Sequence, residues 1–134
     1  FPRLAEAFAQ SEKNYVEFLL SHPRVKQVFY PGLRSHKNHE VAARQMKSFG
    51  GMLSFQVVGG VEEALEICRR VKIFMLAESL GGVESLIEHP GKMTHASVAG
   101  SSLEVPEDLI RLSVGIEHVE DLINDLSQAL NQIV

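Results

Sequence analysis

Arg111 is the residue whose setting most clearly indicates chemistry. It lies inside the apolar run LIRLSVG at 109–115, which has the composition of a strand. A guanidinium keeps its charge at physiological pH, so it must either reach water or bind an anion. Its planar set of donors matches both oxygens of a carboxylate, which predicts a carboxylate anchor. The alternative is an arginine on an edge strand with its head group in water, and the spacing alone favours that alternative.

A second candidate site lies in the stretch 72–97, around which we expect the chain to be organised. The stretch begins with an apolar run at 73–77, long enough for one buried strand. Glu78 and Ser79 follow, and Gly81-Gly82 then allow a sharp turn or a close approach to a ligand, because glycine tolerates positive φ. Polar groups at such a bend could form one wall of a small-molecule site. The alternative is a hairpin with a polar tip, which these residues by themselves favour.

The six histidines raise the question of a metal site. His36, His39 and Glu40 could share one helical face at steps of three and four, a spacing that suits zinc ligands. Their segment, RSHKNHE, is strongly polar, so we expect exposed histidines and no metal site. Cys68 falls on the apolar face of a helix and is expected to be a buried, unreactive thiol.

The composition narrows the class of protein. A chain of 134 residues is long enough for one domain with a modest core, and we expect 1–134 to form a single domain. Acidic residues outnumber basic ones by 17 to 13 without a basic block, which argues against a nucleic-acid partner. No apolar run is long enough to span a membrane. The single cysteine cannot form an internal disulfide, so we expect a reducing compartment, the cytoplasm.

Hydrophobic periodicity predicts the helices, and apolar, strand-like composition with turn signals predicts the strands. Helices are expected at 4–21, 36–47, 61–71 and 119–133, and strands at 25–29, 52–57, 73–77 and 109–115, with a short apolar run at 86–87. The last helix has the clearest pattern, since its apolar residues keep steps of three and four throughout. The last strands follow one another without a helix between them, which favours antiparallel pairing. The sequence therefore predicts an α+β sandwich, with helices packed on one face of a small, mostly antiparallel sheet.

Several motifs resemble one known family. The segments LAESLGGVESLIEHP at 76–90, MTHAS at 93–97 and LIRLSVGIE at 109–117 are similar to the C-terminal domain of the Cys/Met metabolism family of pyridoxal-phosphate (PLP) enzymes. Upstream, YPGL at 30–33 and FGGMLSF at 49–55 resemble the same family, so the likeness runs from about Tyr15 to Leu130. It implies a fold-type-I aminotransferase-like architecture, a homotetramer at full length and a cytoplasmic enzyme of sulfur amino-acid metabolism. The motifs are most like those of the cystathionine γ-lyase and cystathionine γ-synthase branch.

The resemblance assigns substrate contacts to three residues. It implies that Arg111 binds the substrate α-carboxylate, in place of the edge-strand alternative. It implies that Ser79 lies beside that carboxylate and the cofactor lysine. Glu78 stands where the family faces the distal part of the substrate, and a glutamate there is similar to the γ-lyase and γ-synthase branch. It could receive the distal ammonium of cystathionine.

The resemblance also implies what this chain lacks. The lysine that holds PLP covalently and the other cofactor contacts belong to the family's large domain, which would precede Phe1; the chain reads as a fragment or a processed product. We therefore expect PLP in the full-length enzyme, no cofactor bound covalently to this chain, no catalytic residue within it and no activity from it alone. The substrate would be cystathionine, cysteine or a homoserine ester, with elimination and replacement both open. The loop at 99–107 looks shorter than is usual in the family, which bears on substrate access. The alternative function is a silent module that binds amino acids or mediates assembly.

Overall fold

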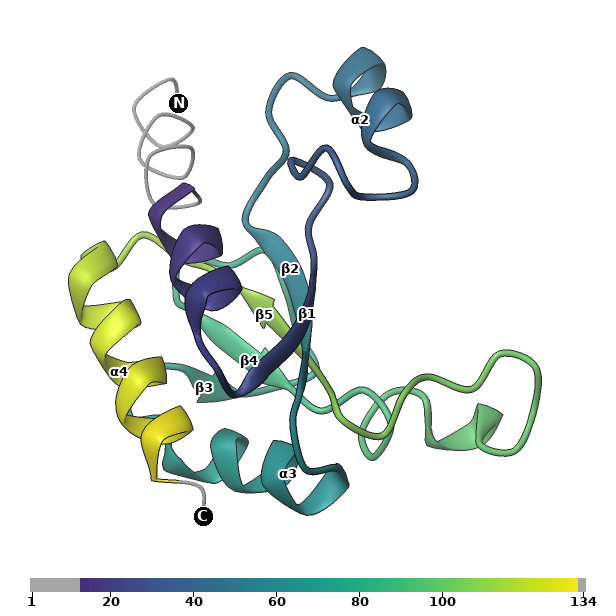
Figure 1. Ribbon diagram of the computed structural model, residues 1–134, viewed down its shortest axis with the longest axis vertical. Helices are drawn as coiled ribbons and strands as arrows, with labels where there is room; N and C mark the ends of the chain where they lie inside the picture. Colours follow the sequence, from purple (N-terminus) through teal and green to yellow (C-terminus); the bar gives the residue numbers. More distant parts are fainter. Residues whose placement is uncertain (1–12, 133–134) are drawn as a thin grey trace.

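The computed structural model describes residues 13–132, which are arranged around one five-stranded sheet (Figure 1). The strands are β1 (Val25–Phe29), β2 (Met52–Val57), β3 (Met75–Leu76), β4 (Leu86–Glu88) and β5 (Leu109–Ser113). The helices are a segment at 13–21, α2 (His39–Gln45), α3 (Val61–Arg70), α4 (Val119–Asn131) and a 3-10 turn, Ala96–Val98. The start of the first predicted helix, 4–12, lies outside the described residues. None of the helices within 13–132 has the length and apolar character needed to cross a membrane.

The sheet is mostly antiparallel, as the sequence predicts. Its order is β1-β2-β5-β4-β3, and the first three neighbouring pairs run antiparallel. The expectation of antiparallel pairing is wrong for the last pair, because β3 and β4 are parallel although they follow one another in the chain. Segment 77–85 must therefore carry the chain back to the starting end of β3 before β4 begins. Glu78 and Ser79 lie on this return segment.

One face of the sheet is apolar and carries three helices. Leu53, Phe55 and Val57 alternate along β2, and Ile110 and Leu112 along β5. All five are buried in one cluster with side chains from segment 13–21, α3 and α4. Figure 1 shows these three helices beside the sheet, whereas α2, which buries no residue, extends away from it. The predicted α+β arrangement with helices on one face is confirmed, and the intervening strand residues lie on the opposite face.

Asp125 of α4 fixes the point at which the chain enters β3. Its buried carboxylate accepts hydrogen bonds from the backbone N–H groups of Lys72, Ile73 and Phe74 at 2.7, 2.8 and 3.1 Å. Burial, and then the charge of Asp125, hold the pKa of the Tyr15 hydroxyl well above its usual value. The carboxylate thus replaces water for three consecutive amides and sets where the return segment 77–85 starts.

β3 is shorter and more exposed than the sequence predicts. A buried strand is expected at 73–77, yet only Met75 and Leu76 pair, and they are 61% and 56% exposed. The physical reason is position, since β3 is an edge strand that pairs with β4 alone. Hydrophobic composition cannot tell an edge strand from a central one.

Asp108 joins three strands at the other end of the sheet. Its carboxylate, just before β5, accepts a hydrogen bond from Gln56 of β2 at 2.8 Å and pairs with Lys26 of β1 at 2.5 Å. Burial by itself would raise the pKa of Asp108, but the hydrogen bonds from Lys26 and Gln56 outweigh it and hold the pKa below its ordinary value.

We predict that Asp108 stabilises the fold at neutral pH and loses this effect in acid. A carboxylate whose pKa is lowered on folding contributes stability above its unfolded pKa of about 4, and this stability disappears as the pH falls through the folded pKa. Asp108→Asn should therefore lower the free energy of unfolding in urea at pH 7, by an amount that shrinks progressively below about pH 4. Asp121→Asn, which changes an exposed carboxylate on α4, is the matched control and should show a smaller difference. A pH-independent effect of Asp108→Asn would contradict the prediction.

Candidate functional site

A row of polar side chains crosses the sheet on the face opposite the helices. Arg111 in β5 lies directly between Ser54 of β2 and Glu88 of β4 in the strand register. Its neighbours Ile110 and Leu112 point into the core, so alternation places the row on the other face. β5 is the central strand of the sheet, and the Arg111 side chain is only 18% exposed. The alternative of an edge-strand arginine with its head group in water is therefore wrong.

Glu88 places a buried negative charge against Arg111. Its side chain has no exposed surface, and its Oε2 lies 2.7 Å from Nη1 of Arg111. Within residues 13–132 neither carboxylate oxygen has a hydrogen-bond partner of good geometry, and neither has the buried Nε of Arg111. The contact is thus a close ion pair without an aligned hydrogen bond. A guanidinium carries five N–H donors, so Arg111 retains donors that residues 13–132 do not use.

Arg111 also contacts the two other predicted site residues, through their backbone. Its Nη2 donates hydrogen bonds to the carbonyl oxygens of Glu78 and Ser79, at 3.0 and 3.1 Å. The side chains of Glu78 and Ser79 are exposed beside it. The structure brings the three residues together around one guanidinium, and their roles toward a substrate stay a prediction.

The return segment 77–85 follows the continuation of β5 closely. Ser113 Oγ accepts a hydrogen bond from the Gly81 N–H at 2.8 Å, and the Ile116 N–H donates to the Val83 carbonyl at 2.9 Å. Ser85 donates to Glu117 through both its N–H and its hydroxyl, each at 2.8 Å. The hairpin alternative is wrong, because the strands on either side of this segment are parallel and the segment is tied to 111–117.

Two glycines set the path of this segment. Gly81 has a φ of +76°, a conformation that costs other residues energy. A Cβ atom at Gly115 would collide with the carbonyl oxygen of Val83. Gly115, just after β5, therefore lets the chain lie backbone against backbone with segment 77–85, and Gly81 allows the turn within that segment.

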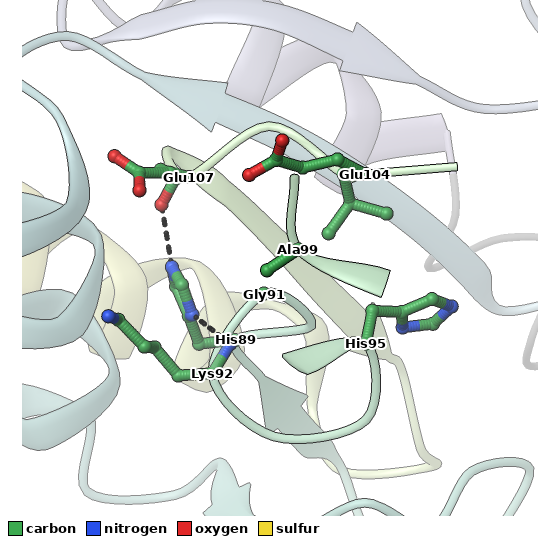
Figure 2. A pocket seen from close by; sticks show the side chains of 8 residues that line it. His89, Gly91, Lys92, His95, Ala99, Glu104 and Glu107 are labelled. Carbon is green, nitrogen blue, oxygen red and sulfur yellow. Dashed lines mark hydrogen bonds between the residues drawn. The ribbon is translucent and has the colours of Figure 1, made fainter. Parts of the chain in front are cut away.

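His89 closes the long connection between β4 and β5. It is buried next to Glu88 in the chain, and its Nδ1 accepts a hydrogen bond from the Lys92 N–H at 3.1 Å. Nε2 therefore carries the hydrogen, which it donates to the Glu107 carbonyl at 2.6 Å. Figure 2 shows His89 between these two contacts, beside a small pocket whose lining comes entirely from segment 89–107. Because Arg111, Glu78 and Ser79 do not line this pocket, it is separate from the candidate site.

The histidines form no metal site in the described part of the chain. His39 has its Nδ1 2.8 Å from the Pro31 carbonyl oxygen and its ring stacked on Phe49, so it is half-buried and less exposed than predicted. Among residues 13–132, no group of three or more His, Cys, Asp or Glu side chains could hold a metal ion. Cys68 is buried as predicted, and burial raises the pKa of its thiol to about 12, which makes the reactive thiolate rare.

Known proteins resemble this chain over most of its length. A family model for the Cys/Met metabolism PLP-dependent enzymes matches residues 3–131. The chain belongs to this family. It is 63% identical to cystathionine γ-synthase of Mycobacterium tuberculosis H37Rv over 85% of this chain and 29% of that protein. It is 50% identical to cystathionine γ-lyase of Dictyostelium discoideum over 95% of this chain and 34% of that protein.

The fold of this Cys/Met metabolism family member is also that of a solved structure. The crystal structure of metB from Corynebacterium glutamicum matches with a TM-score of 0.89 and 56% identity, over 94% of this chain and 33% of that one. The chain thus spans about a third of the length of the relatives that it matches.

The lysines of this chain do not fit the covalent cofactor site of a PLP enzyme. A lysine that binds PLP is desolvated and lies beside groups that hold the cofactor ring. All six lysines of this family member are exposed: Lys13, Lys26, Lys37, Lys47, Lys72 and Lys92. These lysines therefore lack the setting that covalent binding of PLP requires. The candidate binding group of the chain is the guanidinium of Arg111 with its surroundings.

Reasoning from the sequence missed Glu88, Ser113 and Glu117. A signal for Glu88 existed, because LIE at 86–88 and LIR at 109–111 each place one charge in an apolar run, with opposite signs. Such a pair indicates a cross-strand contact. Ser113 and Glu117 carry no comparable signal, since their partners depend on the path of segment 77–85.

We predict that Ser113 holds segment 77–85 in place. Ser113→Ala removes the acceptor of the Gly81 N–H, a bond with a net value of about 1 kcal/mol, so exchange of that amide with solvent should accelerate about fivefold. Hydrogen exchange followed by NMR measures this directly. Ser97→Ala, an exposed serine in the 3-10 turn, should leave the Gly81 rate unchanged. An unaltered rate in Ser113→Ala would mean that the hydroxyl does not tie the segment.

Proposed function

We propose that this chain is the C-terminal, substrate-carboxylate-binding part of a PLP-dependent enzyme of sulfur amino-acid metabolism, of the cystathionine γ-synthase or γ-lyase type. The observation that carries the proposal is Arg111, a largely buried guanidinium in the central strand with unused donors. The identity with cystathionine γ-synthase and γ-lyase sequences supports the substrate class.

Binding a carboxylate at Arg111 would orient the amino acid. A charge-assisted contact to a planar guanidinium fixes both distance and direction, more than a flexible ammonium could. PLP, when bound by the complete enzyme, supplies an electron sink for the amino acid. The contribution of Arg111 is to hold the substrate so that the bond to be broken faces the cofactor correctly.

Glu78 and Ser79 would complete the contacts around the substrate. Their carbonyl groups are hydrogen-bonded to Arg111, so their exposed side chains start from backbone that is fixed relative to the guanidinium. In the proposal, Ser79 contacts the substrate beside its carboxylate, and the Glu78 carboxylate receives the distal ammonium of cystathionine. A pair of opposite charges at the two ends of the site would select a ligand with both an α-carboxylate and a distal amine.

The rest of the proposed enzyme lies outside this chain. The relatives are about three times as long, so a larger domain would supply the cofactor lysine, and the chain alone would be inactive. We extend the proposal to a cytoplasmic homotetramer, from the family resemblance and the lone unpaired cysteine. The alternative is a non-catalytic module that binds amino acids or mediates oligomerisation, which the six exposed lysines favour.

We predict that Arg111→Lys in the full-length protein raises KM for cystathionine. The variant keeps a positive charge next to Glu88 but loses the planar set of donors, a loss of ~2 kcal/mol or about 30-fold in kcat/KM. Steady-state kinetics measures the effect, with Arg44→Lys on the exposed face of α2 as the matched control.

Three outcomes separate the possibilities. A kcat/KM equal to that of the wild type would remove the anchor role from Arg111. Cystathionine binding that depends on Arg111, in a full-length protein that turns over neither cystathionine nor a homoserine ester with cysteine, would favour the non-catalytic module. A loss limited to Arg111→Lys and absent from Arg44→Lys supports the enzyme.

A further inference from the structure

We propose that Glu88 is a positioning residue for Arg111, and that its buried carboxylate holds the guanidinium ready for the α-carboxylate of an amino acid. The inference rests on the proposed function, because it names the group that prepares Arg111 for binding. Nothing in the sequence pattern of LIRLSVG identifies this partner, which comes from another strand.

The first observation is that the pair is fixed by the sheet. Glu88 and Arg111 are direct partners in the antiparallel β4–β5 ladder, so their Cα atoms are held by backbone hydrogen bonds. Oε2 of Glu88 contacts Nη1, while the carbonyls of Glu78 and Ser79 contact Nη2 on the other side. A free arginine side chain has many rotamers and loses conformational entropy when it is fixed. Contacts on two sides remove that freedom before a ligand arrives, which is the basis of preorganised binding.

The second observation is that the pair is incompletely satisfied. Glu88 has no exposed surface, and neither of its oxygens has a well-aligned hydrogen bond within residues 13–132. A buried ion pair compensates for the cost of desolvation only when further hydrogen bonds complete it. The Glu88–Arg111 pair lacks them in the described part of the chain, so a contribution to stability does not explain it. Buried polar groups that lack their full set of hydrogen bonds are expected mainly at functional sites, where binding takes precedence over stability.

The third observation concerns the donors that remain. The two carbonyl contacts engage Nη2, whereas Nε is buried without a hydrogen-bond partner in the described chain. Nη1 faces Glu88 in the close ion pair and makes no aligned hydrogen bond there. Because Nε is buried, a second carboxylate could reach only the donors at the Nη end of the guanidinium, and Glu88 keeps the group from turning away. Because Glu88 already balances the charge of Arg111, the ligand would be recognised by the direction of these donors as well as by charge.

The experiment measures the kinetics of the full-length enzyme with cystathionine. Glu88→Gln keeps the shape of the side chain and removes its charge, and should raise KM about tenfold while kcat changes by less than about twofold. Glu88→Asp keeps the carboxylate and should fall between Glu88→Gln and the wild type. Glu62→Gln, an exposed glutamate on α3, is the matched control and should change neither constant. A purely structural role would instead lower the midpoint of thermal unfolding without this division between KM and kcat.

The double variant Glu88→Gln/Arg111→Lys decides whether Glu88 acts through Arg111. If it does, KM of the double variant should be within about twofold of KM for Arg111→Lys alone. The reason is that the planar guanidinium that Glu88 positions is already absent from Arg111→Lys. Independent, multiplying effects would overturn the inference.

The failure of this inference can be distinguished from failure of the proposed function. If Arg111→Lys raises KM and Glu88→Gln does not, Glu88 is not a positioning residue and the anchor role stands. If neither variant changes KM, the proposed function fails as well. Should Glu88→Gln not fold, Glu88→Asp decides alone: a raised KM with unchanged kcat supports the inference, and an unchanged KM overturns it.

Discussion

A carboxylate without exposed surface lies against a guanidinium in the neighbouring strand, and the candidate site depends on this contact. Each charge loses several kcal/mol of solvation when it leaves water, so neither side chain would be buried here without the other. The strand register keeps the two charges together, because partners in an antiparallel ladder are held side by side by backbone hydrogen bonds. The helix-covered face supplies the apolar burial that keeps β5 and β4 in place, and the opposite face is left for the charged pair.

The same stretch of chain that carries Arg111 also fixes the segment beside it. Hydrogen bonds join the return segment 77–85 to Arg111, Ser113, Ile116 and Glu117, and Gly115 lets the two backbones touch. The parallel β3–β4 pair requires this return, and Asp125 sets its starting point from α4. Glu78 and Ser79 are therefore positioned by the fold relative to the guanidinium, although their side chains reach solvent. A loop held this way can present side chains to a ligand with little loss of entropy on binding.

Local sequence patterns predicted the elements that have one apolar face. The steps of three and four in α4 and the strand-like composition of β2 both reflect burial against the core. Arg111 was identified because a charge in an apolar run needs a partner. Its place in a central strand, the parallel direction of β3 and the pairing with Glu88 were not predicted, since each depends on which distant segments become neighbours. The resemblance of the motifs to the Cys/Met metabolism family identified the relatives, whereas the position of Glu88 required the structure.

A crystal structure of the full-length protein with cystathionine bound tests the central claim most directly. We expect the oxygens of one α-carboxylate within about 3 Å of the Arg111 guanidinium nitrogens, the range of a charge-assisted hydrogen bond. Glu88 should remain buried against Nη1 in the same structure. A bound amino acid whose carboxylate is held by other groups, with Arg111 in contact only with Glu88 and the two loop carbonyls, would contradict it.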